Sequence, residues 1–163
     1  MNIYIASGLT HVPREHFENY VKSIHSIANA LKENDVKYAL VNSDPQLNDI
    51  PNNMKANYCY LWDRKMVEEA DLVIAESSFP STGLGIELQI AENVNIPVII
   101  IYKDFKVNHI DTVEYKNPDD RYYNLQIGEG FVSLMALGLP NIIKVIRYEN
   151  LEELFIEIKN NIN

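Results

Sequence analysis

The sequence predicts an α/β domain in which a mainly parallel sheet of five strands carries helices on both faces. Short apolar runs alternate with longer segments whose apolar residues recur every three or four positions, a pattern typical of βαβ units. Two of these runs, residues 71–76 (DLVIAE) and 97–102 (PVIIIY), have apolar interiors, as expected for strands buried on both faces. The length of 163 residues with 47% apolar content fits one domain over residues 1–163.

The first half of the chain is expected to hold two strands, two helices and a long loop. Asn2–Ser7 is the first strand, and a turn at Gly8–Pro13 follows it. The next helix has one apolar face, made by Phe17, Tyr20, Val21, Ile24, Ile27, Ala28 and Leu31. Lys37–Val41 is the second strand, and the Asn-, Asp- and Pro-rich segment Asn42–Asn57 is a loop placed to cover a site. Asn57–Ala70 is a helix that packs through Tyr58, Leu61, Trp62, Met66 and Val67.

The second half continues the alternation of strands and helices. Its expected elements are a strand at Asp71–Glu76, a loop at Ser77–Gly83, a helix at Leu84–Asn93, a strand at Pro97–Tyr102, an irregular polar segment at Lys103–Gln126, a helix at Gly130–Leu137, a strand at Ile142–Arg147 and a helix at Leu151–Asn160. The last helix starts with Asn150 and Glu153 in the spacing of a capping box.

Charge and cysteine content exclude several classes of protein. The 14 Lys and Arg against 23 Asp and Glu give a net charge of −9, which repels nucleic acid at long range. The single cysteine, Cys59, cannot form an internal disulfide, and no Cys or His cluster has the spacing of a metal site. The N-terminus lacks a basic leader and a long apolar run, so we expect a cytoplasmic protein with no membrane segment.

The segment that carries most information about function is 76–91, ESSFPSTGLGIELQIA. It joins a central strand to a helix, and ligands of open α/β sheets bind outside the carboxyl ends of the strands. Gly83 and Gly85 let a ligand approach the backbone, and the first turn of the helix attracts a negative group. Glu87 in or near that turn is a candidate nucleophile, although a glutamate there also suits an ordinary helix start.

Two other residues are placed to join Glu87. Asp63 lies on the helix before the DLVIAE strand, where the alternative is a solvated charge beside neighbouring basic residues. Tyr4 lies inside the first strand, where the alternative is a packed tyrosine with a satisfied hydroxyl. No dinucleotide or P-loop fingerprint is present, and Ser81 has no nucleophile elbow around it. Cys59 is expected to be a small packed side chain, and the histidines lie at the surface or on a rim.

Taken together, these segments resemble the nucleoside 2-deoxyribosyltransferase superfamily, and its hydrolase branch, the 2′-deoxynucleoside 5′-phosphate N-hydrolases, most of all. The residues that carry the resemblance are Tyr4-Ile5-Ala6-Ser7, Asp63 eight residues before Asp71, Ala70 to Glu76, Pro80-Ser81, and Gly83 to Leu88. They cover about the first hundred residues in order and spacing, and the compound motif is more specific than its parts.

The resemblance implies a flavodoxin-like domain that cleaves the base–sugar bond of a nucleoside or nucleotide without metal or coenzyme. It makes Glu87 the nucleophile that forms a covalent ribosyl ester, Asp63 the acid or orienting group, and Tyr4 the residue that positions Glu87. Ser7, Gly8, Ser81, Gly83 and Gly85 form the implied substrate-binding set, with Ser81 at the position where hydrolases use serine for the 5′-phosphate.

The resemblance also implies a homodimer or larger assembly whose sites are completed by a neighbour, with Arg121-Tyr122-Tyr123-Asn124 as a candidate segment. One feature departs from the hydrolase pattern, because Ser7–His11 lacks the arginine that helps to hold the phosphate. The alternatives are a nucleoside 2-deoxyribosyltransferase, a non-catalytic nucleotide-binding or sensing module, and a flavodoxin-like protein with another ligand. The sequence leaves the base and the choice between ribose and deoxyribose open.

Overall fold

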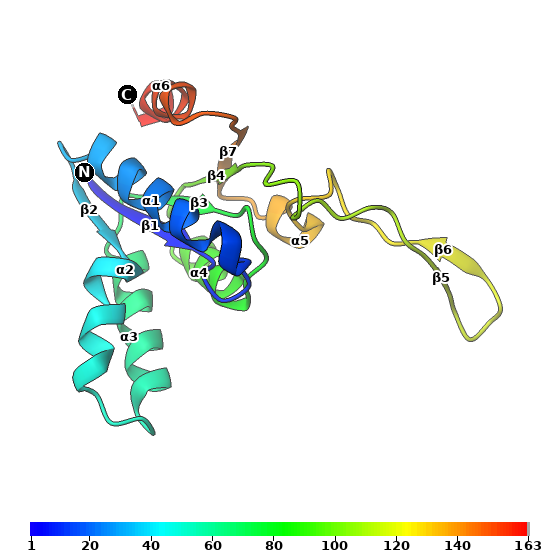
Figure 1. The fold of residues 1–163 in the computed structure, drawn as a ribbon, viewed down its shortest axis with the longest axis horizontal. Coiled ribbons are helices and arrows are strands. Elements are labelled where there is room, and N and C mark those ends of the chain that lie inside the picture. The colour runs from blue at the N-terminus through cyan, green and yellow to red at the C-terminus, as the bar shows by residue number, and fades with distance from the viewer. Residues whose placement is uncertain (163) are drawn as a thin grey trace.

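A computed structural model describes residues 1–162 as an α/β fold built on one five-stranded sheet (Figure 1). The strands of this sheet, in chain order, are β1 (Asn2–Ser7), β2 (Asp35–Tyr38), β3 (Leu72–Glu76), β4 (Val98–Tyr102) and β7 (Ile142–Arg147). The helices are α1 (Arg14–Ala30), α2 (Ala39–Asn42), the 3-10 helix η1 (Asp44–Asp49), α3 (Lys55–Glu68), α4 (Thr82–Asn93), α5 (Leu134–Leu137) and α6 (Leu151–Ile162). The fold class predicted from the sequence is confirmed.

Helices cover both faces of the sheet and bury a separate core on each. Every residue of β3 and β4 is buried, as the unbroken apolar runs predict. Apolar residues of α1 and α6 pack on one face together with Ile3 and Ile5. Residues of α3 and α4 and the chain around α5 pack on the other face together with Tyr4 and Ala6. Alternation along β1 therefore directs the Tyr4 side chain toward α3 and α4.

The strand order is β2-β1-β3-β4-β7, and all neighbouring pairs are parallel. Chain connections leave β1 and β3 in opposite directions, which makes the boundary between them the topological switch point where open sheets bind ligands. Ser7 pairs in register with Glu76 at the carboxyl ends of these two strands. The loops that follow them meet there, and a Cβ on Gly8 would lie 2.5 Å from the Cβ of Ser81. Only glycine permits this contact.

The edge of the sheet departs from the prediction at β2. The strand begins at Asp35 and ends at Tyr38, because the backbone N–H of Tyr38 donates to Oδ1 of Asn42 (3.0 Å) and the chain turns into α2. The expected loop Asn42–Asn57 is therefore partly helical, since η1 follows α2 directly.

Two helices pack differently from the predicted faces. Leu61 is 47% exposed because α3 projects beyond the sheet edge (Figure 1), so that only Met66 and Val67 of this helix are buried. Phe17, in the first turn of α1, is 41% exposed and Val21 is half-buried. The buried residues of the predicted face are Tyr20, Ile24, Ile27, Ala28 and Leu31. The predicted cap of α6 forms, with Glu153 N donating to Asn150 Oδ1 (3.0 Å).

A hairpin arm, residues 107–125, extends away from the sheet beyond the buried Asn108 at its base (Figure 1). Its antiparallel strands are β5 (Glu114–Lys116) and β6 (Tyr122–Asn124), and all six residues are exposed. The prediction that Lys103–Gln126 is irregular was wrong for these two strands. The turn forms because Asn, Pro and Asp residues favour turns and Asp120 adopts a left-handed conformation (φ 65°).

The helix expected at Gly130–Leu137 is also shorter than predicted. Gly130 has a φ of 85°, and the Ser133 hydroxyl caps the next turn by accepting from Ala136 N (3.3 Å), so α5 starts only at Leu134. Within residues 1–162, no helix combines the length and the apolarity needed to cross a membrane.

Candidate active site

A buried hydrogen bond between β1 and α4 forms the centre of the candidate site. The Tyr4 hydroxyl donates to Oε1 of Glu87 over 2.5 Å, and the two side chains are 1% and 9% exposed respectively. The capping serine Ser81 starts α4 at Thr82, two residues earlier than the predicted start at Leu84. Glu87 therefore lies in the second turn, where the helix dipole stabilises a carboxylate less than in the first.

Asp63 of α3 lies near this pair on the neighbouring helix, close enough for its charge to act on both residues. Its Oδ2 accepts a hydrogen bond from the Cys59 thiol one turn earlier (3.4 Å). Its Oδ1 is buried, and no donor among residues 1–162 reaches it. A buried acceptor without a partner is destabilising, so a ligand that brings a donor to Asp63 would gain binding energy from it.

The environment sets the protonation of the central pair. Burial raises the pKa of Glu87 to about 8, the charge of Asp63 adds to this increase, and the hydrogen bond from Tyr4 opposes it. Burial, together with the charge of Glu87, raises the pKa of Tyr4 far above its usual value. Tyr4 therefore remains a hydrogen-bond donor at every working pH, while Glu87 titrates near neutrality, as tuned catalytic carboxyls often do.

Two further groups complete the acidic crevice. Burial and the charge of Asp63 raise the pKa of the Cys59 thiol to about 11, so this side chain acts as a neutral donor rather than as a thiolate. Asp44 of η1 also approaches Asp63, and burial with that nearby charge raises the pKa of Asp44. Sequence reasoning missed Asp44, because the only signal was an acidic residue within a turn-forming segment.

The N-terminal end of α4 forms a second polar group of residues. The Ser81 Oγ accepts from Leu84 N (3.3 Å), which leaves its hydroxyl proton available to a ligand. Gly83 lies beside it, since a Cβ at that position would be 3.6 Å from Ser81 Oγ. Gly8 touches the same serine from the loop after β1.

Two members of the predicted binding set lie apart from the carboxyl groups. Alternation along β1 places Ser7 with Ile3 and Ile5, on the sheet face opposite to Tyr4. Gly85 is exposed and lies two residues before Glu87, on the other flank of α4. The structure therefore brings Tyr4, Asp63 and Glu87 together in one cluster. Gly8, Ser81 and Gly83 lie together in a second group at the start of α4.

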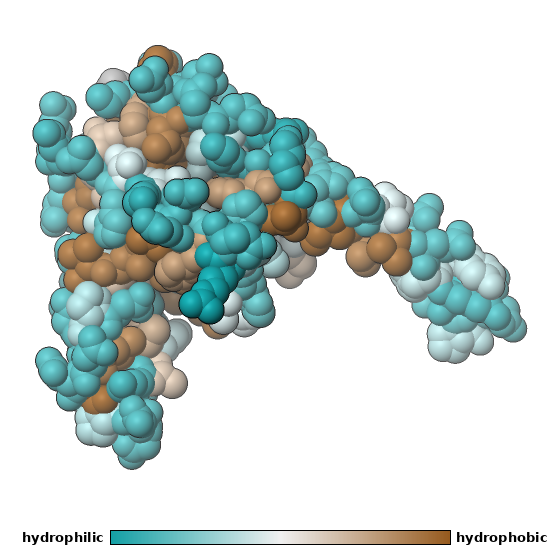
Figure 2. Space-filling view, in the orientation of Figure 1, coloured by the Kyte–Doolittle hydropathy of each residue, from teal (hydrophilic) through white to brown (hydrophobic). Residues whose placement is uncertain are grey.

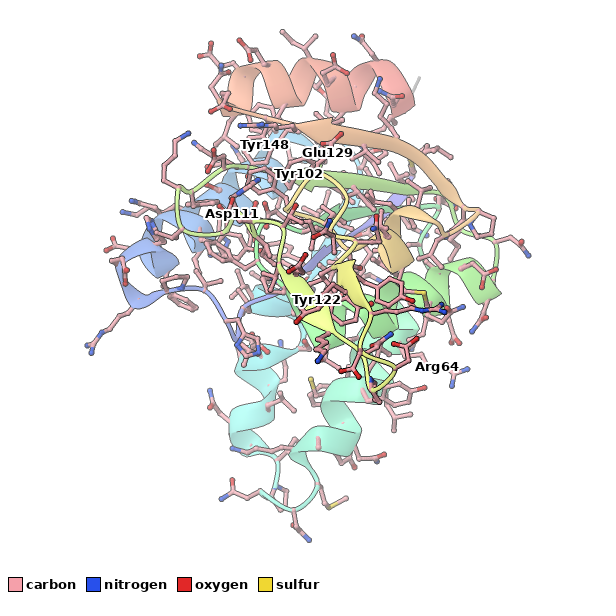
Figure 3. All side chains as sticks on the ribbon, turned by 90° about the vertical axis from the view of Figure 1, so that its right-hand side faces the viewer. Arg64, Tyr102, Asp111, Tyr122, Glu129 and Tyr148 are labelled. Atoms are coloured by element: carbon pink, nitrogen blue, oxygen red, sulfur yellow. The ribbon has the colours of Figure 1, made fainter. Side chains whose placement is uncertain are left out.

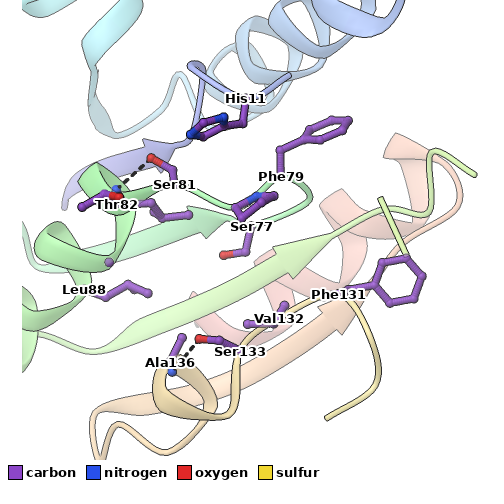
Figure 4. A pocket seen from close by; sticks show the side chains of 13 residues that line it. His11, Ser77, Phe79, Ser81, Thr82, Leu88, Phe131, Val132, Ser133 and Ala136 are labelled. Carbon is purple, nitrogen blue, oxygen red and sulfur yellow. Dashed lines mark hydrogen bonds between the residues drawn. The ribbon is translucent and has the colours of Figure 1, made fainter. Parts of the chain in front are cut away.

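A cavity of about 440 Å³ opens on that other flank, between α4 and the chain around α5 (Figure 4). Its walls include the rings of His11, Phe79 and Phe131 together with Ser81 and Leu88. Glu87 and Asp63 do not line it. Ser81 thus belongs to the wall of this cavity, and His11 lies on its rim, as expected for the histidines of this chain.

No group of three or more His, Cys, Asp or Glu side chains within residues 1–162 is arranged to hold a metal ion. The fold and the site together define an α/β protein with a buried tyrosine–carboxyl pair and a second carboxyl group at the switch point of its sheet.

This chain is similar in sequence to a known protein and similar in fold to several solved structures. The "Putative 2′-deoxynucleoside 5′-phosphate N-hydrolase 1" of Syntrophotalea carbinolica is 34% identical over 101 residues, which are 62% of this chain and 55% of that protein. The match therefore spans little more than half of the relative's length. No protein-family model matches the chain.

Solved structures share the fold at low sequence identity. A CMP N-glycosidase of Clostridium botulinum is 16% identical with a TM-score of 0.58, and each chain is covered to 98%. A conserved protein of Enterococcus faecalis V583 is 22% identical with a TM-score of 0.60, over 98% of this chain and 97% of that one. A 2-deoxyribosyltransferase of Bacillus psychrosaccharolyticus is 14% identical with a TM-score of 0.58, over 94% and 89%. The resemblance to the nucleoside 2-deoxyribosyltransferase superfamily is confirmed.

The raised pKa of Glu87 predicts a pH-dependent cost in stability. Between the unfolded value of about 4.3 and the folded value of about 8, the folded protein keeps a proton that the unfolded chain releases. The free energy of unfolding therefore falls as the pH rises through this range. Glu87→Gln removes this titration, so we expect it to melt at least about 10 °C above the wild type near pH 8.5 and to differ little near pH 4.5.

Calorimetry at the two pH values measures the effect. The matched control is Glu92→Gln, which alters a half-buried glutamate that accepts a hydrogen bond from Gln89 of the same helix. Its Tm difference from the wild type should be the same at both pH values. An equal Tm difference for Glu87→Gln at both pH values would show that the buried carboxyl does not titrate as described.

Proposed function

We propose that this chain is an N-glycosidase that hydrolyses the base–sugar bond of nucleoside or deoxynucleoside 5′-monophosphates through a covalent ribosyl ester on Glu87. The observation that carries the proposal is the buried Tyr4–Glu87 hydrogen bond with Asp63 in the same crevice. The S. carbinolica relative and the C. botulinum structure, by their names, support the same class of reaction.

In the first step, a carboxylate oxygen of Glu87 attacks C1′ as the bond from C1′ to the base nitrogen breaks. The electron pair of that bond leaves with the base, and protonation of the base, by Asp63 or by water that Asp63 orients, completes its release. Glu87 and Asp63 add negative potential where C1′ becomes positive in the oxocarbenium-like transition state.

In the second step, water attacks C1′ and the bond to the Glu87 oxygen breaks. One proton of this water passes to Asp63 or to solvent, and the carboxylate of Glu87 is regenerated. Tyr4 holds the carboxylate in one orientation throughout, because its hydroxyl group donates a hydrogen bond to Glu87.

Base release from a panel of ribo- and deoxyribonucleoside monophosphates, followed by chromatography, tests the proposal. We expect Glu87→Gln to lose at least about a thousandfold in rate and Asp63→Asn about a hundredfold, since nucleophile and acid contribute on this scale. Glu92→Gln should retain full activity.

The same assay separates the alternatives. A faster reaction with a second free base, yielding a new nucleoside, would identify a deoxyribosyltransferase. Binding of a monophosphate without release of base would identify a sensing module. Full turnover by a folded Glu87→Gln variant would remove this residue from the mechanism.

The 5′-phosphate is expected to bind at Ser81 and the first turn of α4. The hydroxyl of Ser81 and the free N–H groups of the helix start are suitable donors to an anion, while Ser7–His11 contains no arginine. An arginine would add about 1.5–3 kcal/mol, so we expect monophosphates to be preferred over nucleosides by a modest margin.

Substitution of Ser81 tests this phosphate site. Ser81→Ala should reduce kcat/KM for the monophosphate about tenfold and leave nucleoside use nearly unchanged, because one hydrogen bond to a charged group is lost. Ser81→Asp should repel the phosphate and reverse the preference. A wild-type protein that uses nucleosides better than monophosphates would favour the transferase instead.

We also propose that the chain forms a homodimer or larger assembly through its arm. The apolar residues at the base of the arm, Val107, Ile110, Val113 and Leu125, are 48–56% exposed, and Figure 2 shows brown surface along this half of the arm. Tyr122 of β6 is 60% exposed (Figure 3). A short two-stranded hairpin is marginally stable alone, so a second copy packed on these residues would stabilise it.

Light scattering combined with gel filtration measures the oligomeric state. Val113→Asp and Tyr122→Asp should shift the protein to the monomer, because a charge in an apolar interface is costly. Ile156→Asp, which alters an equally exposed residue (62%) of α6, is the control and should not. An active monomeric wild type at assay concentration would contradict the proposal.

A further inference from the structure

Glu76 is a fully buried carboxyl group that the proposed mechanism does not use. It is the last residue of β3, at the carboxyl edge of the sheet, and is 0% exposed. Burial raises its pKa, while hydrogen bonds from its neighbours oppose that increase.

The donors around Glu76 account for both of its carboxyl oxygens. Oε1 accepts from the hydroxyls of Ser78 and Tyr148, the latter over 3.3 Å. Oε2 accepts from the backbone N–H of Ser78 (3.3 Å). The Ser78 oxygen itself accepts from Lys103 N (2.8 Å), so its own proton is directed to Glu76. All of these groups point donors at the carboxyl, which therefore serves as the acceptor at the centre of the group.

Asn108 extends this network across the loop after β4. Its side-chain amide donates to the carbonyls of Ser78 and Lys103, both over 2.8 Å. Its Oδ1 accepts from Phe105 N (2.8 Å). Tyr148 follows β7 directly. The network around Glu76 therefore connects the segments that follow three adjacent strands, β3, β4 and β7.

The network holds the segment that leads to the candidate site. Ser81 lies three residues after Ser78, starts α4 as its capping residue and touches the position of Gly8. A shift of residues 77–80 would therefore move the Ser81 hydroxyl and the first turn of α4 together.

We propose that Glu76 is a positioning residue, which fixes the loop between β3 and α4 so that Ser81 is aligned with the 5′-phosphate. This inference rests on the proposed function for its link to phosphate. The effect of Glu76 passes through the loop to Ser81, and the carboxyl itself does not contact substrate.

The main test compares kcat/KM for a nucleoside monophosphate with kcat/KM for the matching nucleoside. Glu76→Gln is nearly isosteric but turns an amide NH₂ toward groups that donate, so we expect the ratio to fall about tenfold. Tyr148→Phe removes one donor without adding another and should give a smaller fall. Glu92→Gln should leave the ratio unchanged. Because both substrates are assayed on one sample, a loss of folded protein lowers both rates equally and does not alter the ratio.

A double-mutant cycle decides whether the effect passes through Ser81. In a Ser81→Ala background, Glu76→Gln should produce little further change in the ratio, since the group that it aligns is already absent. Additive effects of the two substitutions, or an unchanged ratio in folded Glu76→Gln and Tyr148→Phe variants, would overturn the proposal.

Amide exchange measured by NMR gives a readout that does not depend on activity. The N–H groups of Ser78 and Lys103 should exchange at least about tenfold faster in Glu76→Gln than in the wild type, and those of β1 should not change. Equal exchange at Ser78 and Lys103 would overturn the positioning role. Absence of base release by the wild type, by contrast, would overturn the proposed function itself, and the exchange data would still decide whether Glu76 holds the loop.

Discussion

The hydrogen bond from Tyr4 to Glu87 connects the first strand of the sheet to the helix that follows the third. It forms because the strand order makes β1 and β3 neighbours, so that Tyr4 and α4 occupy the same face. It places a tyrosine proton and a carboxyl group together in a region from which water is largely excluded. Asp63 on α3 acts on this pair through its charge. The loop after β1 meets Ser81 at the start of the same helix, α4.

The electrostatics of the crevice follow from its composition. Three carboxyl groups, Asp44, Asp63 and Glu87, influence one another through their charges. Such a concentration of negative potential suits a reaction in which the substrate develops positive charge. The donors available to an anion lie at one end, around Ser81 and the start of α4. The site therefore has an acidic part and a hydrogen-bond-donating part, and a ligand with a cationic transition state and an anionic tail would match both.

Sequence reasoning predicted the sheet well because hydrophobic burial determines it. The bounds of β1 and β7 were predicted to the residue. The apolar runs around Val73 and Ile100 were predicted to be central strands, and both strands are buried. The hairpin escaped prediction because it buries nothing, so its strands lack an apolar pattern. The short α5 escaped because a serine cap and a left-handed glycine, rather than periodicity, decide where it begins.

The candidate site was only partly accessible to the same reasoning. The positions of Tyr4, Asp63 and Glu87 along the chain made them candidates, and the resemblance gave each of them a role. The structure adds the hydrogen bond between Tyr4 and Glu87. Asp44 and the network around Glu76 depend on contacts between residues up to 72 positions apart. The local sequence does not reveal such contacts, because each of these residues has ordinary neighbours along the chain.

The arm contributes to neither of the two apolar cores, since no residue of β5 or β6 belongs to them. Folding of the sheet and the surface presented by the hairpin are therefore separable properties of one chain. The hairpin can be lengthened, shortened or exchanged for another without altering the packing of the sheet. Changes to the hairpin would therefore act on the contacts between copies of the chain rather than on the fold of each copy.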